Sequence, residues 1–280
     1  MKRLAVLGHP VSHSRSPAMH NAALEALGLG AEWRYEAIDL EPAEFARRVR
    51  ALPAEGFVGA NVTIPHKEAA LAIADEASDA ATQIGAANTL SLGGDGIRAD
   101  NTDATGLLAA LPDPVAGRTA LVLGAGGSAR AAVWALAGRG AAVSVWNRTG
   151  ARADELVRDL ARARAGTIAE GRLTPVSADQ ARGGTYDLIV NCTAVGMGDE
   201  EPFGDLPLDP ELLEAETVVV DLVYAGSPSS LVREARERNA TAIDGLEVLV
   251  RQGAESFRIW TGMDPPLDVM REAARRGGQA

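Results

Sequence analysis

Residues 119–130 read TALVLGAGGSAR, and this short stretch decides the fold of the chain. Its apolar start predicts a buried parallel strand, and the alanine-rich run that follows it predicts a helix. Gly124 permits a tight turn between the two, Gly126 lets the backbone approach a pyrophosphate, and the small Ala129 lets the helix pack closely on the strand. The flanking strand and helix favour this interpretation over a merely glycine-rich turn. We therefore expect a dinucleotide site over Gly124, Ala125, Gly126, Gly127 and Ser128.

The end of the next predicted strand, at 142–146, indicates which dinucleotide binds. An NAD-binding protein places an acid about 20 residues after the glycine turn, where it binds the ribose. This chain has Asn147, Arg148 and Thr149 there instead. The fork of a guanidinium can bind a 2'-phosphate, and the two neighbours can add hydrogen bonds, so we expect NADP. The alternative is that Arg148 is one more exposed arginine among the 25 in the chain.

The alternation of strand and helix extends in both directions from this turn. Towards the C-terminus, further strands of a doubly wound sheet are predicted at 187–191, 217–221 and 241–243. Towards the N-terminus, the LPDPVAG stretch at 111–117 breaks every periodicity and is typical of a linker. The region before this linker predicts a smaller α/β unit with strands at 4–8, 31–40 and 57–63, helices at 16–27 and 42–52, a third helix starting at Pro65, and a hairpin over 88–99.

We therefore predict an α/β protein with two domains. Residues 1–111 form a substrate-binding and catalytic domain, and residues 112–245 form the doubly wound cofactor domain. The helical segments 245–260 and 266–275 have no further strand to feed, so we expect the C-terminal return, 246–280, to pack on the first domain. The length of 280 residues agrees with about two domains.

Composition excludes several classes of protein. With 46% hydrophobic and 23% charged residues the chain is neither disordered nor fibrous. Its 38 acids against 27 bases argue against a nucleic-acid partner. No apolar run approaches the roughly 18 residues of a membrane span. The single cysteine, Cys192, cannot form an intrachain disulfide and indicates a reducing, cytoplasmic setting.

Lys67 is the candidate for proton transfer. The chain has only two lysines, Lys2 and Lys67, and a lysine ammonium can lose its proton where a guanidinium cannot. Lys67 follows the strand that ends near Thr63, and α/β proteins bind ligands at carboxyl ends of strands. Taken alone, it could equally be a solvated lysine in a first helical turn.

Two further polar segments stand before predicted helices. Ser14 and Ser16 offer hydroxyls beside a helix N-terminus, which suits a carboxylate, although one of them could simply cap the helix. Asp103 could likewise cap its helix, or orient a substrate hydroxyl and pair with Lys67. His9 and His13 have no evident third partner, so we predict no metal site.

Taken together, these blocks resemble shikimate dehydrogenases, and the match runs in order along nearly the whole chain. The residues that carry the resemblance are Gly8, Pro10, His13, Ser14, Ser16, Pro17, Met19, His20 and Asn21; Asn61, Val62, Thr63, Pro65, His66 and Lys67; Asn88 and Thr89; Asn101, Thr102, Asp103 and Gly106; Gly124 to Gly127; Asn147 to Thr149; and Gly245, Leu246, Leu249, Val250 and Gln252.

The resemblance implies a fold, a reaction and a set of site residues. The fold is an α/β substrate domain joined to a Rossmann-type NADP-binding domain, and the reaction is the reversible, NADPH-dependent reduction of 3-dehydroshikimate to shikimate in aromatic amino acid biosynthesis. Lys67 would be the acid/base residue and Asp103 its paired carboxylate. The substrate would contact Ser14, Ser16, Thr63, Asn88, Asp103, Tyr224 and Gln252. The cofactor would contact the glycine turn, Asn147, Arg148, Thr149, Thr193, Leu222 and Gly245.

One segment departs from the family pattern. Many relatives have a proline two residues after the tyrosine and a threonine three residues later, whereas this chain has Ala225 to Ser229 (AGSPS) there.

Two rival functions stay open at this point. A relative that accepts quinate could use NAD, which the Asn147 to Thr149 segment argues against. A dinucleotide-binding sensor could keep the fold without chemistry, which the presence of Lys67 and Asp103 argues against. The chain is expected to be a monomer or a homodimer.

Overall fold

The computed structural model describes residues 1–164, 171–197, 201–224 and 228–277. Contacts between residues divide the chain into two compact units. The first unit comprises Met1–Gly106 and Leu249–Ala280, and the second comprises Leu107–Val248. Residues 225–227, in the segment that departs from the family pattern, lie outside the described residues.

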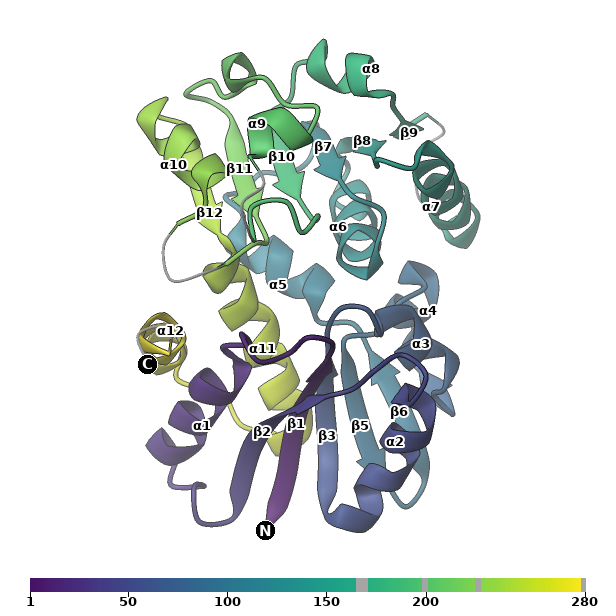
Figure 1. Ribbon diagram of the computed structural model, residues 1–280, viewed down its shortest axis with the longest axis vertical. Helices are drawn as coiled ribbons and strands as arrows, with labels where there is room; N and C mark the ends of the chain where they lie inside the picture. Colours follow the sequence, from purple (N-terminus) through teal and green to yellow (C-terminus); the bar gives the residue numbers. More distant parts are fainter. Residues whose placement is uncertain (165–170, 198–200, 225–227, 278–280) are drawn as a thin grey trace. The chain divides into compact units, whose positions relative to one another are not determined.

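The first unit is built on a six-stranded mixed sheet (Figure 1). Strands β2, β1 and β3 are parallel, β5 and β6 form the predicted hairpin with β5 antiparallel to β3, and β4 pairs in parallel with β6. In sheet order the strands are β2 (Trp33–Asp39), β1 (Lys2–Gly8), β3 (Phe57–Val62), β5 (Thr89–Gly93), β6 (Gly96–Asp100) and β4 (Glu76–Ala77).

The register of this sheet gathers several loops at one edge. Asn61 near the end of β3 pairs with Thr89 at the start of β5, and Thr89 pairs with Asp100 at the end of β6. Because β5 runs against its neighbours, its beginning lies beside their ends. The segments after β1, after β3, before β5 and after β6 therefore share one edge of the sheet.

Helices cover both faces of this first sheet. Ala5 and Leu7 of β1 belong to a buried cluster that also contains Phe45 and Val49 of α2. On the other side of the unit, α1 packs along α12 (Figure 1), so the prediction that the C-terminal helices return to the first domain is confirmed. The helices are α1 (Ser16–Ala26), α2 (Phe45–Ala51), the 3-10 turn η1 (Leu52–Glu55), α3 (Lys67–Ala72), α4 (Asp79–Ile84), α11 (Gly245–Thr261), which begins in the second unit, and α12 (Leu267–Arg276).

The second unit contains a six-stranded, fully parallel sheet. Along the chain, β8 and β9 are added on one side of β7, and β10, β11 and β12 are then added on its other side. The strand order therefore reverses between β7 and β10. This is the doubly wound order of dinucleotide-binding folds, as predicted. In sheet order the strands are β12 (Thr241–Asp244), β11 (Val218–Asp221), β10 (Leu188–Asn191), β7 (Thr119–Leu123), β8 (Ala142–Trp146) and β9 (Leu173–Pro175).

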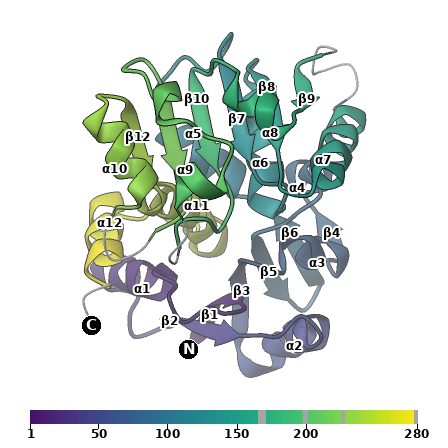
Figure 2. The ribbon, with the colours of Figure 1, turned by 45° about the horizontal axis from the view of Figure 1, so that its top comes forward.

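Alternate residues of β7 face two different buried clusters. Ala120 and Val122 pack with apolar residues of α6 and α7, while Leu121 and Leu123 pack with α8 and α10. This two-sided burial explains why the strand is a continuous apolar run, and Figure 2 shows the sheet with helices on both faces. The helices are α5 (Asp103–Ala110), which begins in the first unit, α6 (Gly127–Gly138), α7 (Gly150–Ala163), α8 (Ala178–Arg182), α9 (Pro202–Asp205), η2 (Pro210–Leu212) and α10 (Ser230–Glu237).

Two predicted helix starts are wrong. The helix expected from Pro65 begins only at Lys67, because Thr63 O accepts the N–H of His66 and closes a separate turn before it. The helix expected from Pro42 begins at Phe45 and ends at Ala51, and the 3-10 turn η1 follows it from Leu52.

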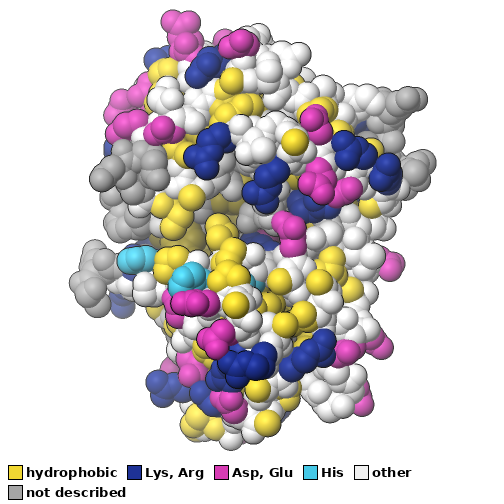
Figure 3. Space-filling view, turned by 45° about the vertical axis from the view of Figure 1, so that its right-hand side comes forward, with side chains coloured by type: hydrophobic (Ala, Val, Ile, Leu, Met, Phe, Trp, Pro, Cys, Tyr) yellow, Lys and Arg dark blue, Asp and Glu magenta, His cyan; other side chains and the backbone are white. Residues whose placement is uncertain are grey.

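Charged side chains are mixed rather than segregated on the face drawn in Figure 3, where arginines and lysines alternate with aspartates and glutamates. Among the described helices, none is long and apolar enough to cross a membrane.

His20 makes the stability of the first unit sensitive to pH. Its ring is fully buried and stacks on Tyr35, with centroids 4.2 Å apart, and within the described chain neither ring nitrogen has a hydrogen-bond partner. Burial lowers the pKa of His20 from 6.5 to about 3. Below about pH 6.5 His20 therefore binds a proton in the unfolded chain but stays neutral in the folded chain. The free energy of unfolding falls as the pH falls.

Replacing His20 with phenylalanine should remove this dependence. From about pH 7.5 to about pH 5, His20 lowers the free energy of unfolding by about 2 kcal/mol, and His20→Phe should lose that slope even if overpacking costs about 1–3 kcal/mol at every pH. Urea unfolding at a series of pH values measures the slope. The exposed His13 provides a matched control, since His13→Phe should keep the wild-type slope. An unchanged slope in His20→Phe would show that His20 is not the group responsible.

Candidate active site

Lys67 and Asp103 form a buried ion pair at the shared edge of the first sheet. Lys67 begins α3 and Asp103 begins α5, and Lys67 Nζ lies 2.6 Å from Asp103 Oδ2. Their side chains are only 11% and 17% exposed. Asp103 does not cap its own helix, because Asn101 Oδ1 accepts the N–H groups of Asp103 and Ala104. The Asp103 carboxylate therefore remains available for the lysine.

Asn88 connects this pair to Gln252. Its amide Nδ2 donates to Asp103 Oδ1 at 2.8 Å and to Gln252 Oε1 at 3.0 Å. The orientation of the amide is fixed, because the backbone N–H of Thr102 donates to Asn88 Oδ1 at 2.7 Å. Lys67, Asp103, Asn88 and Gln252, which the resemblance brought together as site residues, thus form one hydrogen-bonded cluster in the structure.

A layer of buried polar side chains supports this cluster. Asn61, Thr89 and Thr102 were named among the residues that carry the resemblance but with no role, whereas Ser256 and Tyr35 were not identified from the sequence. Ser256 Oγ lies 2.9 Å from Thr89 Oγ1 and 3.2 Å from Thr102 Oγ1, and it accepts from Asn61 Nδ2 at 2.8 Å. Tyr35 donates to Asn61 Oδ1 at 2.8 Å. A network of this kind fixes side chains when every member is bonded. The available signal was a set of polar residues inside otherwise apolar segments, notably Asn61 near the end of β3.

Ser14 and Thr63 lie in the loops that follow β1 and β3 at the same edge, and Ser16 is the first residue of α1. The two loops are tied by a hydrogen bond of 3.0 Å from His9 N to Ile64 O. Neither serine occupies the N-cap position of α1, which belongs to Arg15. Ser14 Oγ instead accepts the N–H of Ser16 at 3.3 Å.

In the second unit, the glycine turn forms as predicted between β7 and α6. Gly124 has φ +110°, and a Cβ there would lie 3.2 Å from the carbonyl oxygen of Cys192, which follows β10. Gly124 therefore stands where the strand order reverses, in a conformation that glycine tolerates best. Ala125 and Gly126 complete the turn, and Gly127 and Ser128 begin the helix.

A pocket of about 380 Å³ lies at the carboxyl ends of β8 and β10. Three of the predicted cofactor residues line it: Asn147, Arg148 and Thr193. The Asn147 amide turns back to donate to Thr149 O at 3.0 Å, while Arg148 is exposed. The sequence analysis did not identify the remaining lining residues, which are Trp146, Ala194, Val195, Asp205 and Leu206.

The other predicted residues of this unit follow β11 and β12. Gly245 begins α11, and a Cβ on it would lie 2.5 Å from the carbonyl oxygen of Leu222, so the backbones of the two segments are in direct contact. Tyr224 lies two residues beyond Leu222, within the described part of the chain. Tyr224 belongs to the second unit and the other predicted substrate residues to the first.

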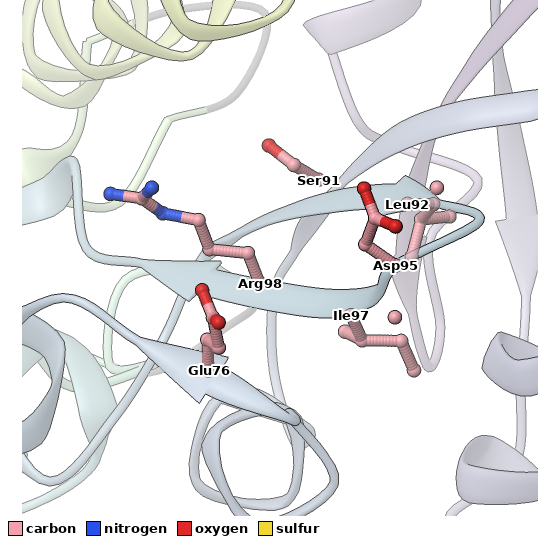
Figure 4. A pocket seen from close by; sticks show the side chains of 8 residues that line it. Glu76, Ser91, Leu92, Asp95, Ile97 and Arg98 are labelled. Carbon is pink, nitrogen blue, oxygen red and sulfur yellow. The ribbon is translucent and has the colours of Figure 1, made fainter.

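A second hollow, of about 250 Å³, lies at the hairpin of the first unit (Figure 4). None of the predicted site residues lines it, and we do not place the site there. The lining residues are Glu76, Ser91, Leu92, Gly93, Asp95, Gly96, Ile97 and Arg98. Among the residues that the structure describes, no group of three or more His, Cys, Asp or Glu side chains could hold a metal ion.

The fold, the Lys67–Asp103 cluster in the first unit and the glycine turn with its neighbouring pocket in the second unit define a dinucleotide-dependent oxidoreductase of the α/β class. Residues 6–90 match the family model of the shikimate dehydrogenase substrate binding domain, and residues 245–275 match that of the shikimate 5'-dehydrogenase C-terminal domain. The chain belongs to the shikimate dehydrogenase family, which confirms the resemblance seen in the sequence.

Individual relatives agree along nearly the full length. Shikimate dehydrogenase (NADP(+)) of Symbiobacterium thermophilum is 44% identical over 97% of this chain and 92% of its own, and that of Methylobacterium radiotolerans is 46% identical over 94% and 92%. The crystal structure of shikimate 5-dehydrogenase from Thermus thermophilus in complex with NADP(H) and shikimate has a TM-score of 0.85 and 43% identity, with 99% of each chain covered.

Proposed function

We propose that this chain catalyses the reversible, NADPH-dependent reduction of 3-dehydroshikimate to shikimate in aromatic amino acid biosynthesis. The observation that carries the proposal is the Lys67–Asp103 ion pair, 2.6 Å long and largely buried at a ligand-binding sheet edge. A regulatory protein of the same fold would have no need of a buried lysine held by a carboxylate. Family membership supplies the substrate and the cofactor.

The pocket of the second unit fits NADP. Asn147, rather than an acid, follows β8, so no carboxylate stands at the position where NAD-binding proteins hold the ribose. Arg148 lines the pocket and is exposed enough to receive a 2'-phosphate. We propose that Asn147, Arg148, Thr149 and Thr193 hold the adenosine end, that the turn from Gly124 to Ser128 holds the pyrophosphate, and that Leu222 and Gly245 line the nicotinamide side.

The chemistry divides between cofactor and protein. NADPH supplies the hydride to the carbonyl carbon when it is bound. Lys67, as an ammonium, donates a proton to the carbonyl oxygen as negative charge develops there. Asp103 holds the ammonium in place, and Asn88 in turn holds Asp103 through its second oxygen. In the oxidative direction Lys67 accepts the proton from the hydroxyl.

The same edge suits the substrate. We propose that Ser14 and Ser16 bind the substrate carboxylate, because both stand beside the start of α1, where hydroxyls and backbone N–H groups accommodate an anion. Thr63, Asn88, Asp103 and Gln252 would bind the ring hydroxyls. Tyr224 would bind near the carboxylate.

A spectrophotometric assay at about 340 nm, where reduced nicotinamide absorbs, tests the proposal. We expect turnover of shikimate with NADP⁺ and little with NAD⁺, with quinate as the control substrate. Turnover of quinate with NAD⁺ would instead identify a relative of relaxed specificity. Binding of NADPH without turnover of either substrate would identify a sensor and overturn the proposal.

The lone cysteine supports a reducing, cytoplasmic setting, which stays a prediction. The expectation of a monomer or a homodimer also stays a prediction.

A further inference from the structure

Asp221 is a buried carboxylate that the proposed chemistry does not use. It is the last residue of β11, is 0% exposed, and pairs in register with Asn191, the last residue of β10. Three neutral groups donate to it: Asn191 Nδ2 at 2.9 Å, Val223 N at 3.1 Å and Ser229 Oγ at 2.6 Å. Burial raises the pKa of Asp221, and these hydrogen bonds oppose the rise. Burying a carboxylate costs free energy unless its oxygens accept hydrogen bonds.

On one side, Asp221 holds the residue that shapes the cofactor pocket. Asn191 Oδ1 accepts both the backbone N–H and the hydroxyl of Thr193, at 3.0 and 2.7 Å. The Asn191 amide also donates to Val195 O at 3.2 Å. Since Thr193 and Val195 line the pocket that contains Arg148, the orientation of the Asn191 amide fixes one wall of this pocket.

On the other side, Asp221 holds the chain on both sides of Tyr224. Val223, which precedes the tyrosine, donates its N–H to Oδ1, and Ser229, which follows it, donates its hydroxyl to Oδ2. Ser229 is also the N-cap of α10, because its Oγ accepts the N–H of Val232 at 3.2 Å. One carboxylate thus holds both the backbone of Val223, directly before Tyr224, and the N-cap residue of α10, Ser229.

We propose that Asp221 is a positioning residue that couples the cofactor pocket to the segment carrying Tyr224. A carboxylate suits this role because both of its oxygens only accept, whereas an asparagine would present an NH₂ group to one of the donors. With its oxygen towards Asn191 and Val223 and its NH₂ group towards Ser229, an asparagine would take away only the acceptor of the Ser229 hydroxyl, whereas an alanine would take away the acceptor of all three donors. The effect on substrate rests on the proposed function, in which Tyr224 contacts the substrate, whereas the effect on the cofactor pocket does not depend on turnover.

Three variants separate the two sides of this coupling. Asp221→Ala should raise both the KM for shikimate and the Kd for NADPH by about tenfold, the loss expected when a hydrogen bond to a charged group is removed. Ser229→Ala should raise the KM for shikimate and leave the Kd for NADPH within about twofold. Asn191→Ala should raise mainly the Kd for NADPH. Steady-state kinetics and NADPH fluorescence titration give the two constants.

Asp187→Ala is the control, made at an exposed aspartate of the same sheet. Asp187 immediately precedes β10, at the opposite end of that strand, and also accepts a backbone N–H and a hydroxyl, both from Thr119. The substitution should lower thermal stability without changing either constant. This result would separate positioning from stability, since a purely structural role for Asp221 would likewise lower Tm and leave both constants unchanged.

Hydrogen exchange keeps the coupling testable apart from catalysis. The amides of Val223 and Thr193 should exchange faster in Asp221→Ala than in the wild type, at both ends of the proposed coupling. If the wild-type chain turns over no shikimate, the proposed function fails, while the NADPH titration and the exchange rates still test the coupling. Asp221→Ala with a wild-type Kd for NADPH and wild-type exchange at Thr193 would overturn it.

Discussion

Replacing Lys67 with alanine should lower kcat by about 10²- to 10⁴-fold while KM changes little, because a positioned general acid contributes about that much to the rate and little to ground-state binding. The ammonium lies 2.6 Å from Asp103, which Asn88 holds in turn. The substitution leaves the Asp103–Asn88–Gln252 hydrogen bonds available, so the ring hydroxyls should still bind. Initial rates at saturating NADP⁺, over a range of shikimate concentrations, separate kcat from KM.

The second lysine provides the control for this experiment. Lys2 lies over the ring of Trp33, 4.6 Å from its centroid, and Lys2→Ala removes the same side chain from a place outside the proposed site. The kcat of Lys2→Ala should match that of the wild type. A near-normal kcat in Lys67→Ala would eliminate Lys67 as the acid/base residue.

Arg148→Ala should weaken NADPH binding by about 10- to 100-fold and NADH binding hardly at all. Losing one charged hydrogen-bonding partner costs about 1.5–3 kcal/mol, and only NADPH carries the 2'-phosphate that the guanidinium would bind. The side chain is exposed at the rim of the pocket, so its removal leaves no buried cavity and should not lower stability. Fluorescence titration with each reduced nucleotide measures the two affinities.

The comparison with NADH is itself an internal control, and a second arginine adds another. Arg139 is exposed at the C-cap of α6, whereas the glycine turn lies at the other end of that helix. Arg139→Ala should leave both affinities unchanged. If Arg148→Ala weakened NADPH and NADH equally, Arg148 would not be the residue that distinguishes them.

The second sheet was the most predictable part of the fold. Residues 119–123 and 142–146 form strands with the predicted bounds. The first was predictable because a strand buried on both faces is an apolar run, and the second because Val143 and Val145 are buried in alternation with less buried residues. Strand β9 was missed, since three residues at a sheet edge are too few to show a period. The start of α3 was placed too early because a proline just before a helix and a proline in its first turn have the same local sequence.

Some residues of the candidate active site can be predicted from sequence motifs, whereas others are identified only by their packing in the structure. Lys67 and Asp103 were named from residue type and position as well as from the resemblance, and Asn88 and Gln252 from the resemblance alone. The structure joins the four by hydrogen bonds, although Lys67 and Gln252 are 185 residues apart in the sequence. Ser256 and Tyr35 could not be found that way. A serine in a long helix and a tyrosine in a strand are ordinary in sequence, and their role follows only from being buried against other polar groups.

The buried polar layer under the Lys67–Asp103 pair also constrains how the sequence can drift. Asn61, Thr89 and Ser256 donate to and accept from one another in a space with 0–4% exposure. Losing any one of them takes a hydrogen bond from each of its buried partners, whereas replacing two partners together by apolar residues of similar shape can be nearly neutral. We therefore expect these positions to be epistatic: a substitution that is harmful alone should be better tolerated beside a compensating change at its partner.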